Sequence, residues 1–189
     1  MWEEVVAREA AQHDARDFRK ALGCFPTGVC LVTTLAPDGG RVGLTANSFS
    51  SVSLDPPMIL WSLARTASSA PVFRDTEYFA INVLAAGDED LSSHFAKPGA
   101  DKFSRHAERF AAGLADVPVL QGAVATFECH SRHRYYGGDH IIVIGVVERY
   151  SHDASRAPLV FHRGRYSAFP PGTASLKSDE KTNLDKKSQ

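Results

Sequence analysis

The chain has 189 residues, of which 43% are hydrophobic and 23% are charged, and its formal net charge is −1. This length is enough for one domain with a buried core, and a charge near zero argues against binding to nucleic acid or to an anionic membrane surface. No apolar run reaches about 18 residues, so no membrane-spanning helix is expected.

Apolar residues at helical spacing predict helix over residues 2–22. Asp14 is placed to cap a second helical piece, residues 15–22, and Gly23 is placed to end it. Strands are predicted where β-branched and other apolar residues cluster between turn residues. In chain order, these strands are residues 28–35, 41–46, 58–63, 77–84, 122–135, 140–150 and 159–162.

Helices are few in the rest of the chain. Residues 68–74 and 88–96 are predicted as short helices, and residues 97–117 as loop or short helix. The small and charged residues 171–189 predict a disordered tail. The prominence of hairpins favours a mainly β (α+β) fold, a closed or nearly closed antiparallel barrel with short peripheral helices.

The first ten residues, M-W-E-E-V-V-A-R-E-A, are acidic and lack the layout of a secretory signal peptide. The three cysteines, Cys24, Cys30 and Cys129, are odd in number and form no C-x-x-C pair. We therefore expect three buried, reduced thiols in a cytoplasmic protein rather than a disulfide framework.

Several chemistries are excluded by motif. There is no G-x-G-x-x-G after a strand and no G-x-x-x-x-G-K-[ST] or G-x-S-x-G, which excludes a Rossmann dinucleotide site and an α/β-hydrolase. His130 and His133 are three residues apart on a predicted strand, so their side chains point to opposite faces. We therefore expect no metal site.

The segment 43–57, G-L-T-A-N-S-F-S-S-V-S-L-D-P-P, is unusually polar. Its hydroxyl, amide and carboxylate side chains are those of Thr45, Asn47, Ser48, Ser50, Ser51, Ser53 and Asp55. Each such group costs a few kcal/mol when it is buried without a partner. The segment is therefore either a Ser/Thr-rich surface loop or the wall of a pocket for an aromatic, hydrogen-bonding ligand.

Three other segments carry chemistry that one ligand could use. S-L-A-R-T-A-S-S (62–69) combines a cation, hydroxyls and a predicted helix start, which suits a phosphate or an ordinary helix cap. H-F-A (94–96) and D-K-F (101–103) place rings and a second cation after a helix, or form a helix end with a solvated charge. G-G-D-H (137–140) puts His140 at the start of an apolar strand, where a solvent-facing histidine is the alternative.

Taken in order, these segments resemble the short-chain flavin reductase family, the reductase components of two-component flavin-dependent monooxygenases. The resemblance covers about residues 17–169, and L-A-R-T-A-S-S is most similar to actinorhodin-type reductases. The matching stretches are F-R-K-A-L-G-C-F-P-T-G-V (18–29), residues 43–57 and 62–69, F-A-I-N-V-L (79–84), residues 94–96 and 101–103, G-D-H (138–140) and F-H-R-G-R-Y (161–166).

The resemblance implies a split-barrel, FMN-binding domain over residues 17–170, after an N-terminal extension (1–16), and a homodimer. It implies an NAD(P)H:flavin oxidoreductase that reduces flavin by hydride transfer and supplies it to a partner monooxygenase. His140 is the implied catalytic residue on the nicotinamide side. The implied flavin contacts are Thr45, Ala46, Asn47 and Ser48 at the ring; Ser62, Leu63, Ala64, Arg65, Ser68 and Ser69 at the ribityl chain and phosphate; His94, Phe95, Ala96, Lys102 and Phe103 closing over them; and Tyr166 nearby.

The resemblance leaves alternatives open. FAD can replace FMN, and NADPH can replace NADH, although the lack of a clear arginine cluster for a 2′-phosphate favours NADH. A single-component flavoprotein of the same fold with tightly bound FMN is a second interpretation of the function. A non-catalytic flavin-binding protein is a third.

Overall fold

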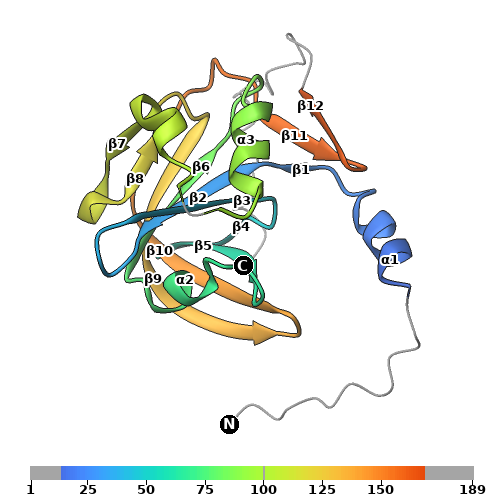
Figure 1. The fold of residues 1–189 in the computed structure, drawn as a ribbon, viewed down its shortest axis with the longest axis horizontal. Coiled ribbons are helices and arrows are strands. Elements are labelled where there is room, and N and C mark those ends of the chain that lie inside the picture. The colour runs from blue at the N-terminus through green and yellow to red at the C-terminus, as the bar shows by residue number, and fades with distance from the viewer. Residues whose placement is uncertain (1–13, 100, 169–189) are drawn as a thin grey trace, which may run out of the picture.

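A computed structural model describes residues 14–99 and 101–168. They form a mainly β structure with a few short helices, as predicted (Figure 1). In chain order the elements are α1 (Ala15–Leu22), β1 (Thr27–Gly28), β2 (Cys30–Leu35), β3 (Arg41–Ala46), β4 (Ser50–Leu54), β5 (Pro57–Ala64), α2 (Ala70–Asp75), β6 (Tyr78–Val83), α3 (Glu89–Ala96), η1 (Ser104–Arg109), β7 (Phe110–Ala112), η2 (Leu114–Asp116), β8 (Pro118–Leu120), β9 (Ala125–Gly137), β10 (His140–His152), β11 (Leu159–His162) and β12 (Arg165–Ala168). The expected helix over residues 2–13 and the expected disordered tail lie outside the described residues.

One antiparallel sheet of seven strands dominates the structure, in the order β3-β2-β6-β9-β10-β5-β4. Two smaller sheets, β1-β11-β12 and β7-β8, lie beside it. Figure 1 shows β9 and β10 as the long yellow and orange pair, with α3 across the sheet from them and α1 out to one side. The strands β3 and β4 are the two edges, so the sheet is open.

This open sheet differs from the closed or nearly closed barrel that the hairpin-rich sequence favoured. No backbone ladder joins β3 to β5 or β4 within the described residues. The chain leaves β3 after Ala46, and a side chain makes the connection to β5 instead: the Ser48 hydroxyl bonds to the main chain of Ser62. A side-chain bridge of this kind holds the two strands near each other without completing the hydrogen-bonding ring of a barrel.

Two hydrophobic clusters occupy the two faces of the sheet, and the pleat of β2 divides its residues between them. Cys30 and Val32 belong to one cluster, with Trp61 and Phe73, whose rings meet edge to face at 5.0 Å. Leu31 belongs to the other cluster, which lies beneath α3. Both faces of β2 and β6 are covered in this way, as the apolar sequence of residues 77–84 predicted.

The helix α1 has the predicted bounds. The Asp14 side chain accepts a hydrogen bond from the Arg16 N–H at 2.9 Å, and Gly23 ends the helix. No residue of α1 is buried, and Cys24, which follows it, is exposed. The expectation of a buried thiol is therefore wrong for Cys24.

The other two thiols are buried and free. Burial raises the pKa of both Cys30 and Cys129 to about 12. They are therefore neutral, apolar parts of the core at physiological pH, as expected.

None of the helices in the described ranges is long and apolar enough to cross a membrane.

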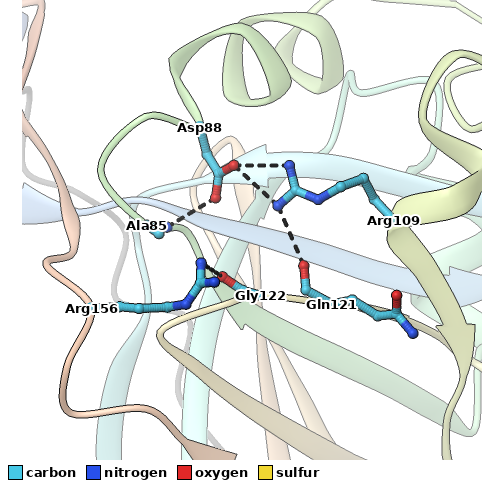
Figure 2. Close-up of polar contacts among 6 residues, drawn as sticks. All are labelled: Ala85, Asp88, Arg109, Gln121, Gly122 and Arg156. Atoms are coloured by element: carbon cyan, nitrogen blue, oxygen red, sulfur yellow. Dashed lines mark hydrogen bonds and ion pairs between the residues drawn. The ribbon is translucent and has the colours of Figure 1, made fainter.

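An ion pair fixes the first turn of α3. The Asp88 carboxylate accepts hydrogen bonds from the Ala85 N–H at 3.1 Å and from both terminal nitrogens of Arg109 at 3.1 Å (Figure 2). Arg109 also donates to the Gln121 carbonyl at 3.3 Å, just beyond β8. Asp88 is 8% exposed, so its carboxylate is largely removed from water. These bonds join the start of α3 to the end of η1 and to the residue that follows β8.

Candidate functional site

A cavity of about 510 Å³ lies where β3, β5, α3 and the start of β10 meet. Segments that are distant in sequence converge here because β5 lies beside β10, with Ala64 opposite His140. The lining residues are Leu44, Thr45, Ala46, Asn47, Ser48, Ser62, Leu63, Ala64, Thr66, Ala67, Ser68, Ser69, Phe95, Ala96, Lys97, Pro98, Lys102 and His140. Its volume is in the range of ordinary cofactor and small-ligand sites.

Hydrogen bonds from within the protein fix the polar wall of this cavity. The Ser48 hydroxyl donates to the Ser62 carbonyl at 3.0 Å and accepts from the Ser62 N–H at 2.9 Å. Thr45 donates to the Ser92 carbonyl of α3 at 2.6 Å, and the Ser92 hydroxyl bonds to the Tyr166 hydroxyl at 2.9 Å. The side chains of Ser48 and Thr45 therefore position the wall, and main-chain groups are left to bind a ligand.

The edge position of β3 supplies such main-chain groups. Within the main sheet, β3 is hydrogen-bonded only to β2. Every second N–H and C=O of an edge strand points away from its one neighbour. The end of β3, Leu44–Ala46, lines the cavity. It therefore offers donors and acceptors in the fixed spacing that a planar heterocycle can use.

A half-buried cation stands at the other end of the cavity. The Lys102 ammonium donates to the Phe95 carbonyl at 2.8 Å and to the Gly43 carbonyl at 3.3 Å. An ammonium has three N–H donors, so one remains for a ligand. Burial lowers the pKa of Lys102. An anion bound beside Lys102 would offset that desolvation.

Close packing brings Lys102 to this position. Phe95 and Phe103 meet edge to face at 5.1 Å above Gly43. A Cβ placed on Gly43 would lie 3.0 Å from Phe95 and 3.1 Å from Phe103. Glycine at position 43 therefore allows α3 and the Lys102 segment to approach β3. Asp101 tightens the same turn by accepting hydrogen bonds from the Phe103 and Ser104 N–H groups at 3.2 and 3.0 Å, which lower its pKa.

Two further cavities adjoin the first. One, of about 430 Å³, is lined by Arg41, Val42, Gly43, Ser68, Ser69, Val72, Pro98, Gly99, Lys102 and Phe103. The other, of about 180 Å³, is lined by Val29, Thr45, Ala46, Asn47, Ala96, Phe161 and Tyr166. Each shares four residues with the main cavity. We call the larger of these two the second cavity.

His140 lies at the rim of the main cavity. Its Nδ1 is 2.7 Å from a carboxylate oxygen of Asp139, which lowers the pKa of Asp139 through that hydrogen bond and the neighbouring charge. The side chain of His140 is 45% exposed, so one edge of its ring is available to a second ligand. A hydrogen bond at Nδ1 directs Nε2 away from Asp139.

Most of the residues that the sequence nominated come together here. Thirteen line the main cavity: Thr45, Ala46, Asn47, Ser48, Ser62, Leu63, Ala64, Ser68, Ser69, Phe95, Ala96, Lys102 and His140. Phe103 lines the second cavity, and Tyr166 lines the small one. His94 lies behind the wall, with Nε2 3.1 Å from the Lys102 carbonyl.

Arg65 differs from the expectation. It is not among the residues that line these cavities. Its N–H bonds to the Asp139 carbonyl at 2.9 Å, and its guanidinium lies 5.3 Å from the centre of the Tyr136 ring. Because the Arg65 backbone is hydrogen-bonded to the turn between β9 and β10, its side chain lies against that hairpin and not in the cavity.

Five lining residues were not nominated from the sequence: Leu44, Thr66, Ala67, Lys97 and Pro98. Each lies next to or between nominated residues in the sequence, and this position was the only signal that could have identified them. Among the five, Lys97 adds a second cation to the cavity lining. Within the described ranges, no Asp or Glu lines the main cavity. The site therefore suits an anionic ligand that also has an extended apolar face.

The family model described as "Flavin reductase like domain" matches residues 22–170 of this sequence. The chain belongs to the flavin reductase family. Among its relatives, the "FMN reductase (NADH) SmoA" of Agrobacterium fabrum is 42% identical over 156 residues, which are 82% of this chain and 87% of that protein. The "Flavin-dependent trigonelline monooxygenase, reductase component" of Acinetobacter baylyi is 42% identical over 87% of this chain. The aligned region is 52% of that relative, so this chain spans about half of that relative's length.

A solved structure of a related protein has a similar fold. The "NADH:FAD oxidoreductase SgcE6" of Streptomyces globisporus, "in complex with NAD and FAD fragments", superposes with a TM-score of 0.81 at 35% identity. The match covers 89% of this chain and all of that chain. The fold described above is therefore that of the flavin reductase family.

Proposed function

We propose that this chain is an NAD(P)H:flavin oxidoreductase that reduces a diffusible flavin and supplies it to a separate monooxygenase. The observation that carries the proposal is the composition of the main cavity: an edge strand at one end, a half-buried lysine with a free donor at the other, and His140 at the rim. Relatives named as an FMN reductase and as the reductase component of a monooxygenase support it.

The flavin would lie with its ring against the segment Thr45–Ser48 and its phosphate toward Ser68, Ser69 and Lys102. The edge of β3 would hydrogen-bond the polar edge of the ring and stabilise charge that develops there on reduction. Ser69 precedes α2 without using its side chain as a cap, which leaves its hydroxyl for the phosphate. Lys102 would give its third donor to the same phosphate.

The nicotinamide and the flavin supply the hydride chemistry themselves when they are bound. The protein has to stack the two rings, exclude water and hold them in line. His140 is the proposed catalytic residue on the nicotinamide side. Asp139 would position it by holding Nδ1. Arg65 would hold the hairpin that carries both, through its bond to the Asp139 carbonyl and its contact with Tyr136.

The cofactors that we propose are FMN and NADH. FAD and NADPH remain as alternatives, because the contacts assigned above involve only the part that FMN and FAD share. The proposed domain is residues 17–170, and we propose that its open sheet curves as a split barrel, supported by the Ser48–Ser62 bridge. The two buried cysteines and the exposed one are all free, which supports a reducing, cytoplasmic setting.

We also propose that the chain is a homodimer. The supporting observation is the apolar face of α1 and the residues after it: Phe18, Leu22 and Phe25 are 59%, 60% and 74% exposed. Exposed apolar groups gathered in this way are typical of an interface. Light scattering after gel filtration measures the mass directly, and a monomeric mass would contradict this part of the proposal.

The test is NADH oxidation by purified, dialysed protein, followed by the loss of nicotinamide absorbance, with and without added FMN, FAD and riboflavin. We expect turnover that depends on added flavin. Turnover that is independent of added flavin, from a yellow protein, would show a tightly bound prosthetic group instead. Absence of turnover with both NADH and NADPH would overturn the proposal, and flavin binding without turnover would indicate a non-catalytic flavin-binding protein.

A further inference from the structure

We infer that His106 is a positioning residue for the proposed flavin phosphate site, and that it acts through His94 on the segment that carries Lys102. The inference rests on the proposed function, because that function assigns the phosphate to Lys102. It goes further in assigning a use to a histidine of η1 that lines neither the main cavity nor the two cavities beside it.

His106 and His94 form a pair of rings behind the wall of the main cavity. Their ring centroids are 5.2 Å apart, and the ring planes meet edge to face at 71°. The Nε2 of His94 is in turn 3.1 Å from the Lys102 carbonyl. Because a carbonyl only accepts hydrogen bonds, this Nε2 is the donor and carries a proton. The ring of His106 therefore supports the imidazole that holds the main chain of Lys102.

The backbone makes a second connection between His106 and the same segment. The His106 N–H donates to the Phe103 carbonyl at 3.0 Å. Phe103 directly follows Lys102 and packs edge to face on Phe95 at 5.1 Å, and Lys102 bonds to the Phe95 carbonyl. A displacement of His106 is therefore expected to reach Lys102 by two routes, through the ring of His94 and through the turn at Phe103.

The surroundings of the His106 ring favour its neutral form. Its Nε2 is buried and has no hydrogen-bond partner among the described residues. A doubly protonated ring would carry an N–H donor at that nitrogen without an acceptor. The charges that act on the ring come from His94 on α3 and from Arg105, Glu108 and Arg109 on η1. Burial and the three basic groups outweigh Glu108 and lower the pKa of His106 below its ordinary value of 6.5.

Protonation of His106 should therefore loosen the hold on Lys102. Because the pKa of the ring is lower in the packed arrangement than in water, acidification below about pH 6.5 favours arrangements in which the ring is hydrated. Such arrangements give up the contact with His94 and, with it, the position of the Lys102 ammonium. The apparent affinity for FMN falls with the fraction of molecules that keep the packed arrangement. Riboflavin has no phosphate, so its affinity should depend much less on this fraction.

The experiment measures the dissociation constants of FMN and riboflavin by fluorescence titration at about pH 8 and about pH 5.5, on either side of the ordinary histidine pKa. It compares the unmodified protein, His106→Gln and the control His152→Gln, which changes an exposed histidine at the end of β10. Glutamine keeps a polar group at position 106 that gains no proton in this range. A phosphate monoester gains a proton at about pH 6, and this effect on FMN is common to all three proteins.

We expect acidification to weaken FMN several-fold more in the unmodified protein and in His152→Gln than in His106→Gln. At the higher pH, His106→Gln should bind FMN somewhat more weakly than the unmodified protein, because glutamine supports the ring of His94 with less surface. The riboflavin affinity of the unmodified protein should change much less with pH than its FMN affinity. An equal loss of FMN affinity in the unmodified protein and His106→Gln, or equal losses for the two flavins, would overturn the inference.

A measurement on the unmodified protein avoids dependence on any variant. A ligand that binds the packed arrangement must also favour the neutral ring, so FMN should lower the pKa of His106 further and riboflavin should not. This pKa is obtained from the pH dependence of the His106 ring signals in nuclear magnetic resonance spectra. A pKa that FMN leaves unchanged or raises would overturn the inference and leave the proposed function intact. Failure to bind either flavin at any pH would instead overturn the proposed function.

Discussion

The hydroxyl of Ser48 and the main chain of Ser62 make a reciprocal pair of hydrogen bonds, one in each direction, at 3.0 and 2.9 Å. The pair joins the segment after β3 to the C-terminal part of β5, and β3 and β5 form no backbone ladder with each other. Both residues line the main cavity. One small side chain therefore sets the separation of two walls of the proposed flavin site.

Ser48→Ala should accordingly loosen the site more than it harms the fold. We expect flavin affinity to fall several-fold, and the free energy of unfolding to fall by about 1 kcal/mol, since one hydroxyl loses two neutral hydrogen bonds. Fluorescence titration and urea denaturation measure the two quantities. Ser50→Ala is the control, because that hydroxyl is exposed and bonds only to its neighbour Ser51. Equal losses in the two variants would contradict the assignment.

Lys102 should make flavin binding depend on the phosphate. Lys102→Ala should weaken FMN about tenfold through loss of a charge-assisted contact, and riboflavin, which has no phosphate, much less. Lys97→Ala tests the neighbouring, exposed cation as a comparison. Thermal denaturation of the same variants separates this effect from the loss of the bonds to Phe95 and Gly43.

The same lysine predicts a pH dependence. Burial lowers the pKa of Lys102, and a bound phosphate favours the protonated form, so binding of FMN takes up a proton as the pH approaches that pKa. FMN affinity should therefore decline from neutral to alkaline pH more steeply than riboflavin affinity. Parallel declines for both flavins would show that the phosphate does not lie beside Lys102.

His140→Ala should raise the KM for the nicotinamide more than the KM for flavin, because the proposed function places the nicotinamide beside His140. Steady-state kinetics with each substrate varied in turn measure the two constants. Asp139→Asn should change them in the same direction by a smaller factor, since the amide retains a partner for Nδ1. His152→Ala, at the exposed far end of β10, is the control. Equal increases in both constants would refute the role of His140.

Glu128 should shape the stability of the fold at acidic pH. Burial alone would raise its pKa, but hydrogen bonds from Arg149, at 2.6 Å, and from the Leu114 N–H outweigh burial and hold the pKa below the ordinary value of 4.5. A lowered pKa in the folded state stabilises the fold above the ordinary value, and this contribution is lost as the pH falls through the folded-state pKa.

Urea denaturation at neutral pH and at about pH 3.5 tests whether the free energy of unfolding falls with acidification as expected. The unmodified protein should lose stability between the two conditions. Glu128→Gln should be less stable at neutral pH and should lose less on acidification, because it has no carboxylate to protonate. Glu148→Gln, an exposed neighbour on β10, is the control. An equally steep loss in Glu128→Gln would show that other groups govern acid stability.

Local signals in the sequence located the elements that form locally. The bounds of α1 were predicted because Asp14 caps it and Gly23 follows it. The strand β3 was predicted to the residue because a strong turn precedes it. The strands β4, β7, β8 and β12 were missed, since each is short and depends on a partner strand for its hydrogen bonds. The alanines of Phe110–Ala112, for example, have little strand preference of their own.

The part of the site that strand pairing brings together could be predicted from the sequence. Thr45–Ser48 and Ser62–Ser69 were nominated by resemblance, and the pairing of β5 with β10 brings His140 to them. The direction of Arg65 could not be read from its segment, because the Asp139 carbonyl, Gly138 and Tyr136 on the β9–β10 hairpin determine it. The second cavity was not predicted, since it forms between β3 and the segment of Phe103, which packs against Phe95 of α3.

The two fixed ends of α3 have a kinetic consequence. The Asp88–Arg109 pair holds its first turn (Figure 2). Lys102 donates a hydrogen bond to the Phe95 carbonyl in its last turn. A helix that is held by hydrogen bonds at both ends is expected to move little when a ligand enters or leaves. Under the proposed function, flavin would enter and leave past the exposed stretch Lys97–Gly99, which lines the main cavity and the second cavity.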